Sequence, residues 1–204
     1  ITNRAAETTD ATFNTGGQIL THTNPTGGVT TFTYDNATAL LQSRTDTDTG
    51  VTTIQYDNLS RPVRTTHPDG AEIDRTYDPL DRLTSITDED DVVTAFGFDA
   101  NSNTTSITFG QGTPEEQTTT STYDALDRLL ATTDPTGNTT TLAYDYHGDP
   151  TSITLPDGSV TTLTYDARRS LVRTTDEEGH ATEIAYTPSR LISSTTSPLG
   201  RRPV

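Results

Sequence analysis

The sequence predicts an all-β protein built as one repetitive, meandering antiparallel sheet. Three observations lead to this fold class. An aromatic residue recurs about every 21 residues, a turn signal recurs in phase with it, and the residues between them alternate with the period of two that is typical of a strand. No segment shows the helical period of 3.6 residues over 11 or more positions, so helices are not expected.

The first marker is an aromatic residue that is followed in most copies by aspartate. The spacings between successive copies are 21, 22, 21, 21, 25, 21, 21 and 21 residues, which chance does not produce. Because the aspartate recurs with the aromatic residue, we expect it to accept a backbone N–H and fix a turn rather than to catalyse. The markers are Phe13, Tyr34, Asp35, Tyr56, Asp57, Tyr77, Asp78, Phe98, Asp99, Tyr123, Asp124, Tyr144, Asp145, Tyr165, Asp166 and Tyr186.

The second marker is a glycine, fourteen residues after most of these aromatic residues and sixteen after Tyr34. Asp91 stands at the one place in the series where the glycine is missing. In several copies the glycine closes a Pro-x-Gly sequence, in which proline presets φ and glycine accepts a positive φ, so a turn is predicted there. The glycines are Gly27, Gly50, Gly70, Gly112, Gly137, Gly158, Gly179 and Gly200.

The residues between the glycine and the next aromatic residue predict a strand. An apolar residue stands two positions before the aromatic residue, as in the pairs Ile54/Tyr56 and Leu142/Tyr144, and residues two apart share one face of a strand. Threonine, which favours strands, fills many of the other positions. After the aromatic residue come a polar corner and a second short run, such as residues 151–154, which we interpret as a returning strand. Nine such units predict about 18 strands.

The repeats also define the predicted domain organisation. Residues 13–204 form one continuous array of nine repeats, and residues 1–12, which lack a clear aromatic marker, are predicted to be a partial N-terminal repeat. The 25-residue spacing places four extra residues within 112–117. We expect a longer acidic turn there, which is either a contact site or a tolerated surface insertion.

The repeat motif resembles that of the YD-repeat, or RHS-repeat, family. The consensus of that family is Tyr-Asp, two variable residues and then Gly-Arg-Leu, and residues 77–83 and 123–129 match it best, with Asp81 and Asp127 in place of the consensus glycine. Further drift is seen at Ser60-Arg61, at Gly148-Asp149 and at Ser189-Arg190. The resemblance covers residues 13–204. It implies a sheet that curls as part of a β-shell or β-solenoid-like array, with tyrosines stacked along it.

The resemblance also implies a function and a location. Members of the family are large secreted or cell-surface proteins, among them polymorphic-toxin shells, wall-associated repeat proteins and teneurin-like proteins. The expected role is a non-catalytic structural segment that contributes an arc of β-shell around a C-terminal effector or toxin, or displays it. The expected partners are neighbouring repeats, identical copies and an encapsulated toxin. The family's self-cleavage motif has only an altered counterpart at residues 197–201, which we interpret as an ordinary turn.

Two alternative functions remain open at this stage. One is a stretch of an extracellular fibre or adhesin assembled edge to edge, because terminal strands of a sheet present unpaired ladder groups. The other is a module that binds a cell-surface glycan or a receptor. A groove of aromatic side chains would be needed for it, and Tyr146 is the one tyrosine that stands outside the repeat markers.

Composition excludes several classes of protein. Only 29% of the residues are apolar, against roughly 45–50% in an ordinary globular domain, so a compact enzyme core is not expected. The formal net charge of −16 disfavours nucleic acid as a partner. The sequence contains no run of about 20 apolar residues, which a membrane-spanning helix would need. The chain has no cysteine, so it has neither disulfides nor thiolate metal sites.

No catalytic, cofactor-binding or metal-ligating residues are predicted. The acidic segments 46–50 and 88–91 contain many carboxylates, but neither is followed by a bidentate glutamate at the spacing of a calcium loop, so solvated turns are expected there. The four histidines lie in different repeats, and we expect them near turns and not in a cluster. They are His22, His67, His147 and His180.

Overall fold

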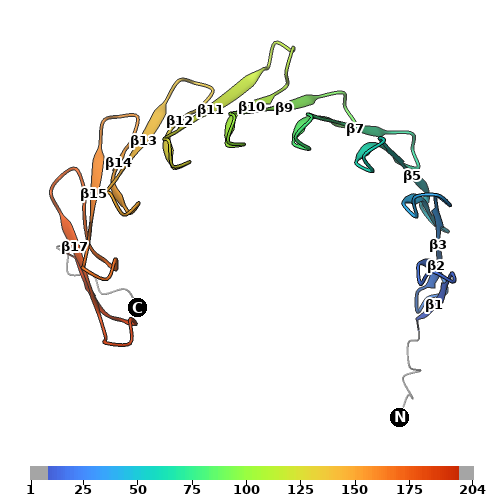
Figure 1. Cartoon of the computed structure of the whole chain (residues 1–204), viewed down its shortest axis with the longest axis horizontal. Coiled ribbons are helices and arrows are strands. Elements are labelled where there is room, and N and C mark those ends of the chain that lie inside the picture. The colour runs from blue at the N-terminus through green and yellow to red at the C-terminus, as the bar shows by residue number, and fades with distance from the viewer. Residues whose placement is uncertain (1–8, 198–204) are drawn as a thin grey trace. The chain divides into compact units, whose positions relative to one another are not determined.

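The computed structural model describes residues 9–197, which form strands and turns and contain no helix (Figure 1). No helix that could span a membrane is therefore found in this range. The prediction of an all-β repetitive antiparallel fold is confirmed. The strands are β1 (Asp10–Phe13), β2 (Ile19–Thr23), β3 (Val29–Tyr34), β4 (Leu41–Asp46), β5 (Gly50–Tyr56), β6 (Pro62–Thr66), β7 (Glu72–Tyr77), β8 (Leu83–Thr87), β9 (Val93–Phe98), β10 (Thr104–Phe109), β11 (Gln117–Tyr123), β12 (Leu129–Thr133), β13 (Thr139–Tyr144), β14 (Pro150–Thr154), β15 (Val160–Tyr165), β16 (Leu171–Thr175), β17 (Ala181–Tyr186) and β18 (Ile192–Thr196).

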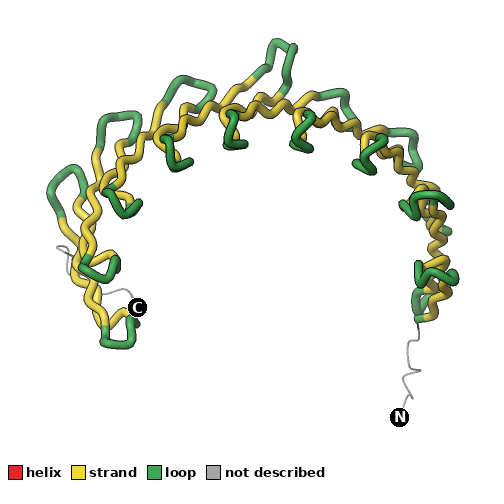
Figure 2. The backbone as a smooth tube through the Cα atoms, viewed as in Figure 1, coloured by secondary structure: helices red, strands yellow, loops and turns green. Residues whose placement is uncertain are grey.

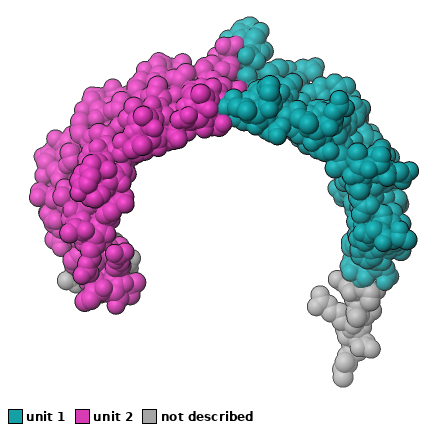
Figure 3. All heavy atoms as spheres, in the orientation of Figure 1, with its two compact units in different colours: residues 1–95, 109–114 teal, residues 96–108, 115–204 magenta. Residues whose placement is uncertain are grey.

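The chain divides into two compact units, residues 1–95 with 109–114 and residues 96–108 with 115–204 (Figure 3). Each unit by itself is a curved ribbon one sheet thick (Figure 2). In the first unit, each strand from β1 to β9 pairs antiparallel with the next. The strands from β11 to β18 do the same in the second unit. This is the meander that the alternating strands and turns predict.

A bulge lies beside eight of the aromatic markers, where each pairs with the returning strand, and the period-of-two pattern does not predict it. In the pair β7·β8, Thr76 faces Ser85 but Tyr77 faces Leu83, so Thr84 is an extra residue. A bulge increases the local twist and changes the direction of the side chain beside it. The same shift occurs at Phe13, Tyr34, Tyr56, Tyr123, Tyr144, Tyr165 and Tyr186.

In several strands the two faces differ in exposure, as the period of two predicts, whereas β2, β6, β8, β9 and β14 are half-buried at every residue. In β15, Thr161, Leu163 and Tyr165 are half-buried, whereas Val160 and Thr162 on the opposite face are exposed. No large apolar side chain among the described residues is fully buried. The apolar residues therefore form a thin row along one face and not a closed core.

The turns at the edge opposite the tyrosines use left-handed backbone conformations. Gly70 has φ = 89° and Gly137 has φ = 90°. Asp91, at the position where the glycine is missing, takes the same conformation with φ = 61°. The longest connection joins β10 to β11 through residues 110–116 and contains the predicted insertion. Gly200 and residues 1–8 of the predicted N-terminal repeat lie outside the described residues.

Candidate functional site

The aspartate of each Tyr-Asp pair holds the turn that joins the two strands of its repeat. In the turn 57–61, Oδ1 of Asp57 accepts the backbone N–H of Leu59 at 2.9 Å and that of Arg61 at 3.0 Å. The N–H of Asp57 donates to the carbonyl of Arg61 at 3.0 Å. Equivalent bonds to Oδ1 from residues two and four positions later form at Asp78, Asp99, Asp124, Asp145 and Asp166.

The fourth residue of each of these turns has a positive φ, whatever its side chain. The value is 65° at Ser60, 65° at Asp81 and 64° at Arg169. This is the position at which the family consensus has glycine, because a residue without Cβ adopts this conformation with least strain. The interpretation of Ser189-Arg190 as a drifted Gly-Arg pair is therefore wrong by one residue. Arg190, with φ = 63°, occupies the glycine position.

An arginine at the fifth position of the turn joins one repeat to the next. Nε of Arg61 donates to Oδ2 of Asp57 at 2.7 Å, and Nη1 donates to the carbonyl oxygen of Asp78 at 3.1 Å and to Oδ1 of Asp81 at 2.8 Å. The guanidinium carbon lies 4.7 Å from the ring centroid of Tyr77, within the range of a cation–π contact. Hydrogen bonding to Arg61 lowers the pKa of Asp57, and that to Asp57 raises the pKa of Arg61.

The same arrangement recurs at Arg128. Its Nε donates to Oδ2 of Asp124 at 2.6 Å, its Nη1 donates to the carbonyl oxygen of Asp145 at 3.1 Å, and its guanidinium carbon lies 4.8 Å from the ring centroid of Tyr144. The hydroxyl of Tyr144 donates to the carbonyl oxygen of Leu129 at 2.8 Å. One tyrosine therefore contacts the preceding repeat twice, through its ring face and through its hydroxyl.

One pair of repeats uses the same two positions with the charges exchanged. Asp149 occupies the fifth position of its turn, and Arg169 occupies the fourth position of the next turn, 20 residues later. Nε of Arg169 donates to Oδ2 of Asp149 at 2.8 Å and Nη2 donates to Oδ1 at 2.7 Å. Arg61 and Asp81 are also 20 residues apart, so a search for opposite charges at this spacing would have found both pairs. Sequence reasoning missed them.

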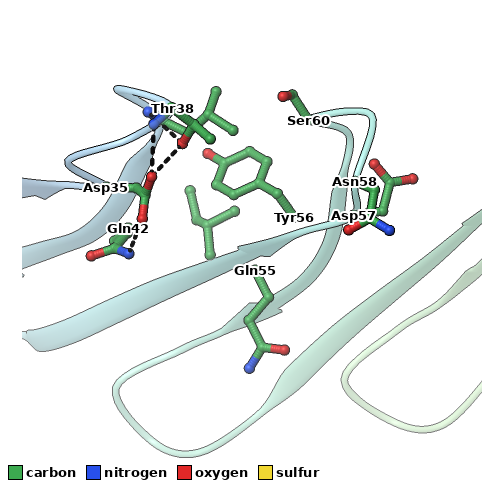
Figure 4. A pocket seen from close by; sticks show the side chains of 10 residues that line it. Asp35, Thr38, Gln42, Gln55, Tyr56, Asp57, Asn58 and Ser60 are labelled. Atoms are coloured by element: carbon green, nitrogen blue, oxygen red, sulfur yellow. Dashed lines mark hydrogen bonds between the residues drawn. The ribbon is translucent and has the colours of Figure 1, made fainter.

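In three repeats, a groove opens in front of a tyrosine whose preceding turn ends in a residue other than arginine. The groove at Tyr56, with a volume of about 470 Å³, follows Leu40 (Figure 4). Similar grooves at Tyr165 (about 390 Å³) and Tyr186 (about 490 Å³) follow Asp149 and Ser170. The residues that line the groove at Tyr56 are Asp35, Thr38, Leu40, Gln42, Ile54, Gln55, Tyr56, Asp57, Asn58 and Ser60.

The other side chains considered from sequence do not converge. His67, His147 and His180 lie in turns, and His22 is the next-to-last residue of β2, close to the turn that begins at Asn24. Nε2 of His67 is 3.3 Å from Oε1 of Glu89. Among residues 9–197, no group of three or more histidine, aspartate or glutamate side chains is placed to hold a metal ion.

Two comparisons address the sequence itself. The family model described as RHS Repeat matches residues 77–114, 123–151 and 144–181. The first and second of these begin at Tyr77 and Tyr123, the tyrosines of the two best motif copies. A search of curated proteins found no match.

Solved structures share the fold. A chain of the crystal structure of TcdB2-TccC3-Cdc42 matches with a TM-score of 0.55 at 20% identity, over 93% of this chain and 12% of that one. A chain of the Photorhabdus luminescens Tc holotoxin pore with the TccC3-D651A mutation matches with a TM-score of 0.58 at 17% identity, over 95% and 13%. The chain thus spans about one eighth of the length of these structures, and at this identity the likeness concerns the fold.

Proposed function

Because this chain belongs to the RHS-repeat, or YD-repeat, family, we propose that it is a non-catalytic structural segment of a larger secreted or cell-surface protein. Nine YD-type repeats in residues 13–204, preceded by the partial repeat 1–12, contribute an arc of β-shell. That shell encapsulates or displays a C-terminal effector or toxin. The chain acts outside the cell and neither binds nucleic acid nor inserts into a membrane.

The observation that carries this proposal is that the polar side chains of the turns contact neighbouring repeats. Asp57, Arg61 and Tyr77 hold one another and the adjoining turns, and Asp124, Arg128 and Tyr144 do the same. An active site instead needs a nucleophile, acid or base directed at a substrate. Because these polar side chains contact neighbouring repeats, their arrangement favours a structural role for the sheet.

The likeness to the Tc structures supports the shell over other uses of a repetitive sheet. Both matches extend over more than nine tenths of this chain, so the likeness covers nearly the whole array and not one part of it. Each unit is curved, as the wall of an enclosure must be (Figure 2).

Electron microscopy of the intact parent protein tests the proposal. We expect globular hollow particles, and we expect any domain encoded after this segment to resist a protease until the shell is opened by acid or denaturant. A solid compact particle, or a downstream domain digested at the same rate in the intact and the opened protein, would refute the enclosure. Hydrolytic or transferase activity that purifies with this 204-residue chain alone would refute the non-catalytic role.

Edge-to-edge assembly into a fibre is a second candidate, favoured by the exposure of the terminal strands. All four residues of β1 and four of the five in β18 are exposed, including Ile192 at 63%. An exposed apolar strand at a sheet end invites pairing with another chain. Filaments of fixed width that disappear in the variant Ile192→Lys would establish this candidate in place of the shell, and a monomer at all concentrations would exclude it.

A further inference from the structure

We propose that the groove in front of Tyr56 binds the arginine side chain of a partner polypeptide. The chain supplies its own template for this binding, because Arg61 and Arg128 occupy the equivalent place in two other repeats. The inference rests on the groove geometry and holds whether the array forms a shell or a fibre.

The template consists of three acceptors and one ring. Arg61 donates to a carboxylate of its own turn (Asp57), to a main-chain carbonyl oxygen of the next turn (Asp78) and to a side-chain oxygen there (Asp81), while its guanidinium lies over Tyr77. Arg128 repeats the carboxylate, carbonyl and ring contacts at Asp124, Asp145 and Tyr144. Two independent copies show that this frame suits a guanidinium.

The groove at Tyr56 has the carboxylate and the ring of this frame, in Asp35 and Tyr56, but leucine in place of the arginine. The N–H of Asp35 donates to the carbonyl of Leu40 at 2.8 Å, and Ala39 has φ = 60°. Leu40 therefore holds the position of Arg61, although its turn is one residue longer. Figure 4 shows the ring of Tyr56 directed into the space between the turn that carries Asp35 and the turn that carries Ser60.

The carboxylate of Asp35 has an oxygen available for the ligand. Its Oδ1 accepts the N–H of Ala37 at 3.0 Å and both the N–H and the hydroxyl of Thr38 at 2.8 Å. Its Oδ2 accepts a long hydrogen bond of 3.3 Å from Nε2 of Gln42. At Asp57 and Asp124 the corresponding oxygen accepts an arginine Nε at 2.7 and 2.6 Å.

Charge selects this groove among the three. The described residues that line it include Asp35 and Asp57 and no cationic side chain. The groove at Tyr186 contains Arg168 and Arg190, and in the groove at Tyr165 Arg169 already pairs with Asp149. The hydroxyl of Thr38, first among several hydrogen bonds, lowers the pKa of Asp35, so this carboxylate is charged at neutral pH.

The occupant is an arginine and not another cation. A guanidinium is planar, stacks on an aromatic ring and donates in several directions at once, whereas an ammonium acts as a point charge. The net charge of −16 attracts a basic segment from a distance.

Nuclear magnetic resonance of the 204-residue chain, titrated with the blocked peptide Gly-Gly-Arg-Gly-Gly, tests the inference. We expect the ring resonances of Tyr56 and the amide of Gln42 to shift together along one saturable curve. The lysine peptide should bind several-fold more weakly and the neutral citrulline peptide should not bind. Shifts that do not saturate, that are equal for lysine, or that appear at Tyr77 and not at Tyr56, would overturn the proposal.

The variant Leu40→Arg separates binding from folding. Its new arginine should occupy the groove as Arg61 does, so the chain stays folded and peptide affinity falls about tenfold or more. Leu126→Arg is the matched control, because it adds the same charge at an exposed turn and should leave affinity unchanged. Equal losses in both variants would overturn the groove as the site. If the unliganded chain self-associates and Leu40→Arg abolishes that, the occupant is a second copy and the separate partner is disproved.

Discussion

In the regions 57–81 and 149–169, an ion pair joins two consecutive turns, but the positions of the two charges are exchanged. In the first region, the cation Arg61 ends one turn and the anion Asp81 lies in the next turn. In the second, Asp149 and Arg169 exchange these roles at the same spacing of 20 residues. The backbone positions are equivalent, because both turns place a left-handed residue fourth and the charged partner fifth.

The region with Asp149 lacks two contacts that the region with Arg61 makes. Arg61 reaches a carbonyl oxygen and covers the ring of Tyr77, and the hydroxyl of that tyrosine donates to the carbonyl of Pro62 at 3.0 Å. Asp149 cannot make such contacts, and the groove before Tyr165 stays open. The repeat therefore fixes where opposite charges meet, and in these two regions the residue at the fifth position determines whether the next tyrosine ring is covered or faces an open groove.

Acid should weaken both regions, with the largest effect of the changes considered. Hydrogen bonds to Arg61 and to Arg169 lower the pKa values of Asp57 and Asp149 below 3.8, and those from Thr136 and Asn138 lower the pKa of Asp134 to about 2. A carboxyl group with a lower pKa in the folded state stabilises fully above its unfolded value, and this contribution is lost as the pH falls through its folded value. We expect a constant melting temperature from pH 7 to about 5 and a steep fall between about pH 4 and 2. A melting temperature unchanged at pH 2.5 would contradict this.

Reversing one charge should break the first region next most strongly. Arg61→Asp places a third carboxylate between Asp57 and Asp81, and we expect the largest drop in urea midpoint of any single substitution discussed. The double variant Arg61→Asp with Asp81→Arg recreates the charge order of 149 and 169. It should recover part of the loss, and a midpoint equal to or below that of the single variant would disprove the equivalence.

Removing each arginine without reversing charge measures how much the closed junction adds. Arg61→Leu loses hydrogen bonds to three residues and the ring contact, whereas Arg169→Leu loses the two bonds to Asp149. Thermal melting should show a fall for Arg61→Leu about twice that for Arg169→Leu, because bidentate surface pairs alone contribute little. Equal falls would mean that the ring and carbonyl contacts are without effect.

The smallest expected difference concerns the tyrosine hydroxyls. Tyr77→Phe removes the hydrogen bond to Pro62 and should cost about 1 kcal/mol in the free energy of unfolding. Tyr165→Phe should cost less, since the described contacts of Tyr165 include no such bond. The pKa of its phenol is raised, by burial first and then by Asp149 and Asp145. Urea unfolding of both variants checks the order, and a greater loss for Tyr165→Phe would reverse the assignment.

The sequence predicted the elements of this fold because each has a local cause. Aromatic residues such as Tyr144 mark strand ends, and glycines such as Gly137 mark positions where φ must be positive. Asp91 shows how far this goes: the spacing located the missing glycine, and the residue there adopts the glycine conformation at φ = 61°. The order of the strands in the sheet could be predicted because short connections place each strand beside the next one in the chain.

The junctions between repeats were not predicted, because they depend on register. The bulge at each tyrosine shifts the returning strand by one residue, and that shift decides which side chain of the next turn faces Arg61 or Asp149. No local pattern reports it. The error at Arg190 has a different, local cause: its Arg-Leu pair resembles the consensus, but counting from Tyr186 places Arg190, with φ = 63°, in the glycine position.

The thin apolar row along one face also sets how this chain responds to temperature. Unfolding changes the heat capacity mainly by wetting apolar surface, by roughly 12–15 cal/mol/K per residue in globular proteins. Here no large apolar side chain among residues 9–197 is fully buried, so less new surface is wetted. We therefore expect a calorimetric baseline step well below the globular value and a broad, shallow stability curve. A sheet of this kind would keep nearly the same stability over a wide range of temperature.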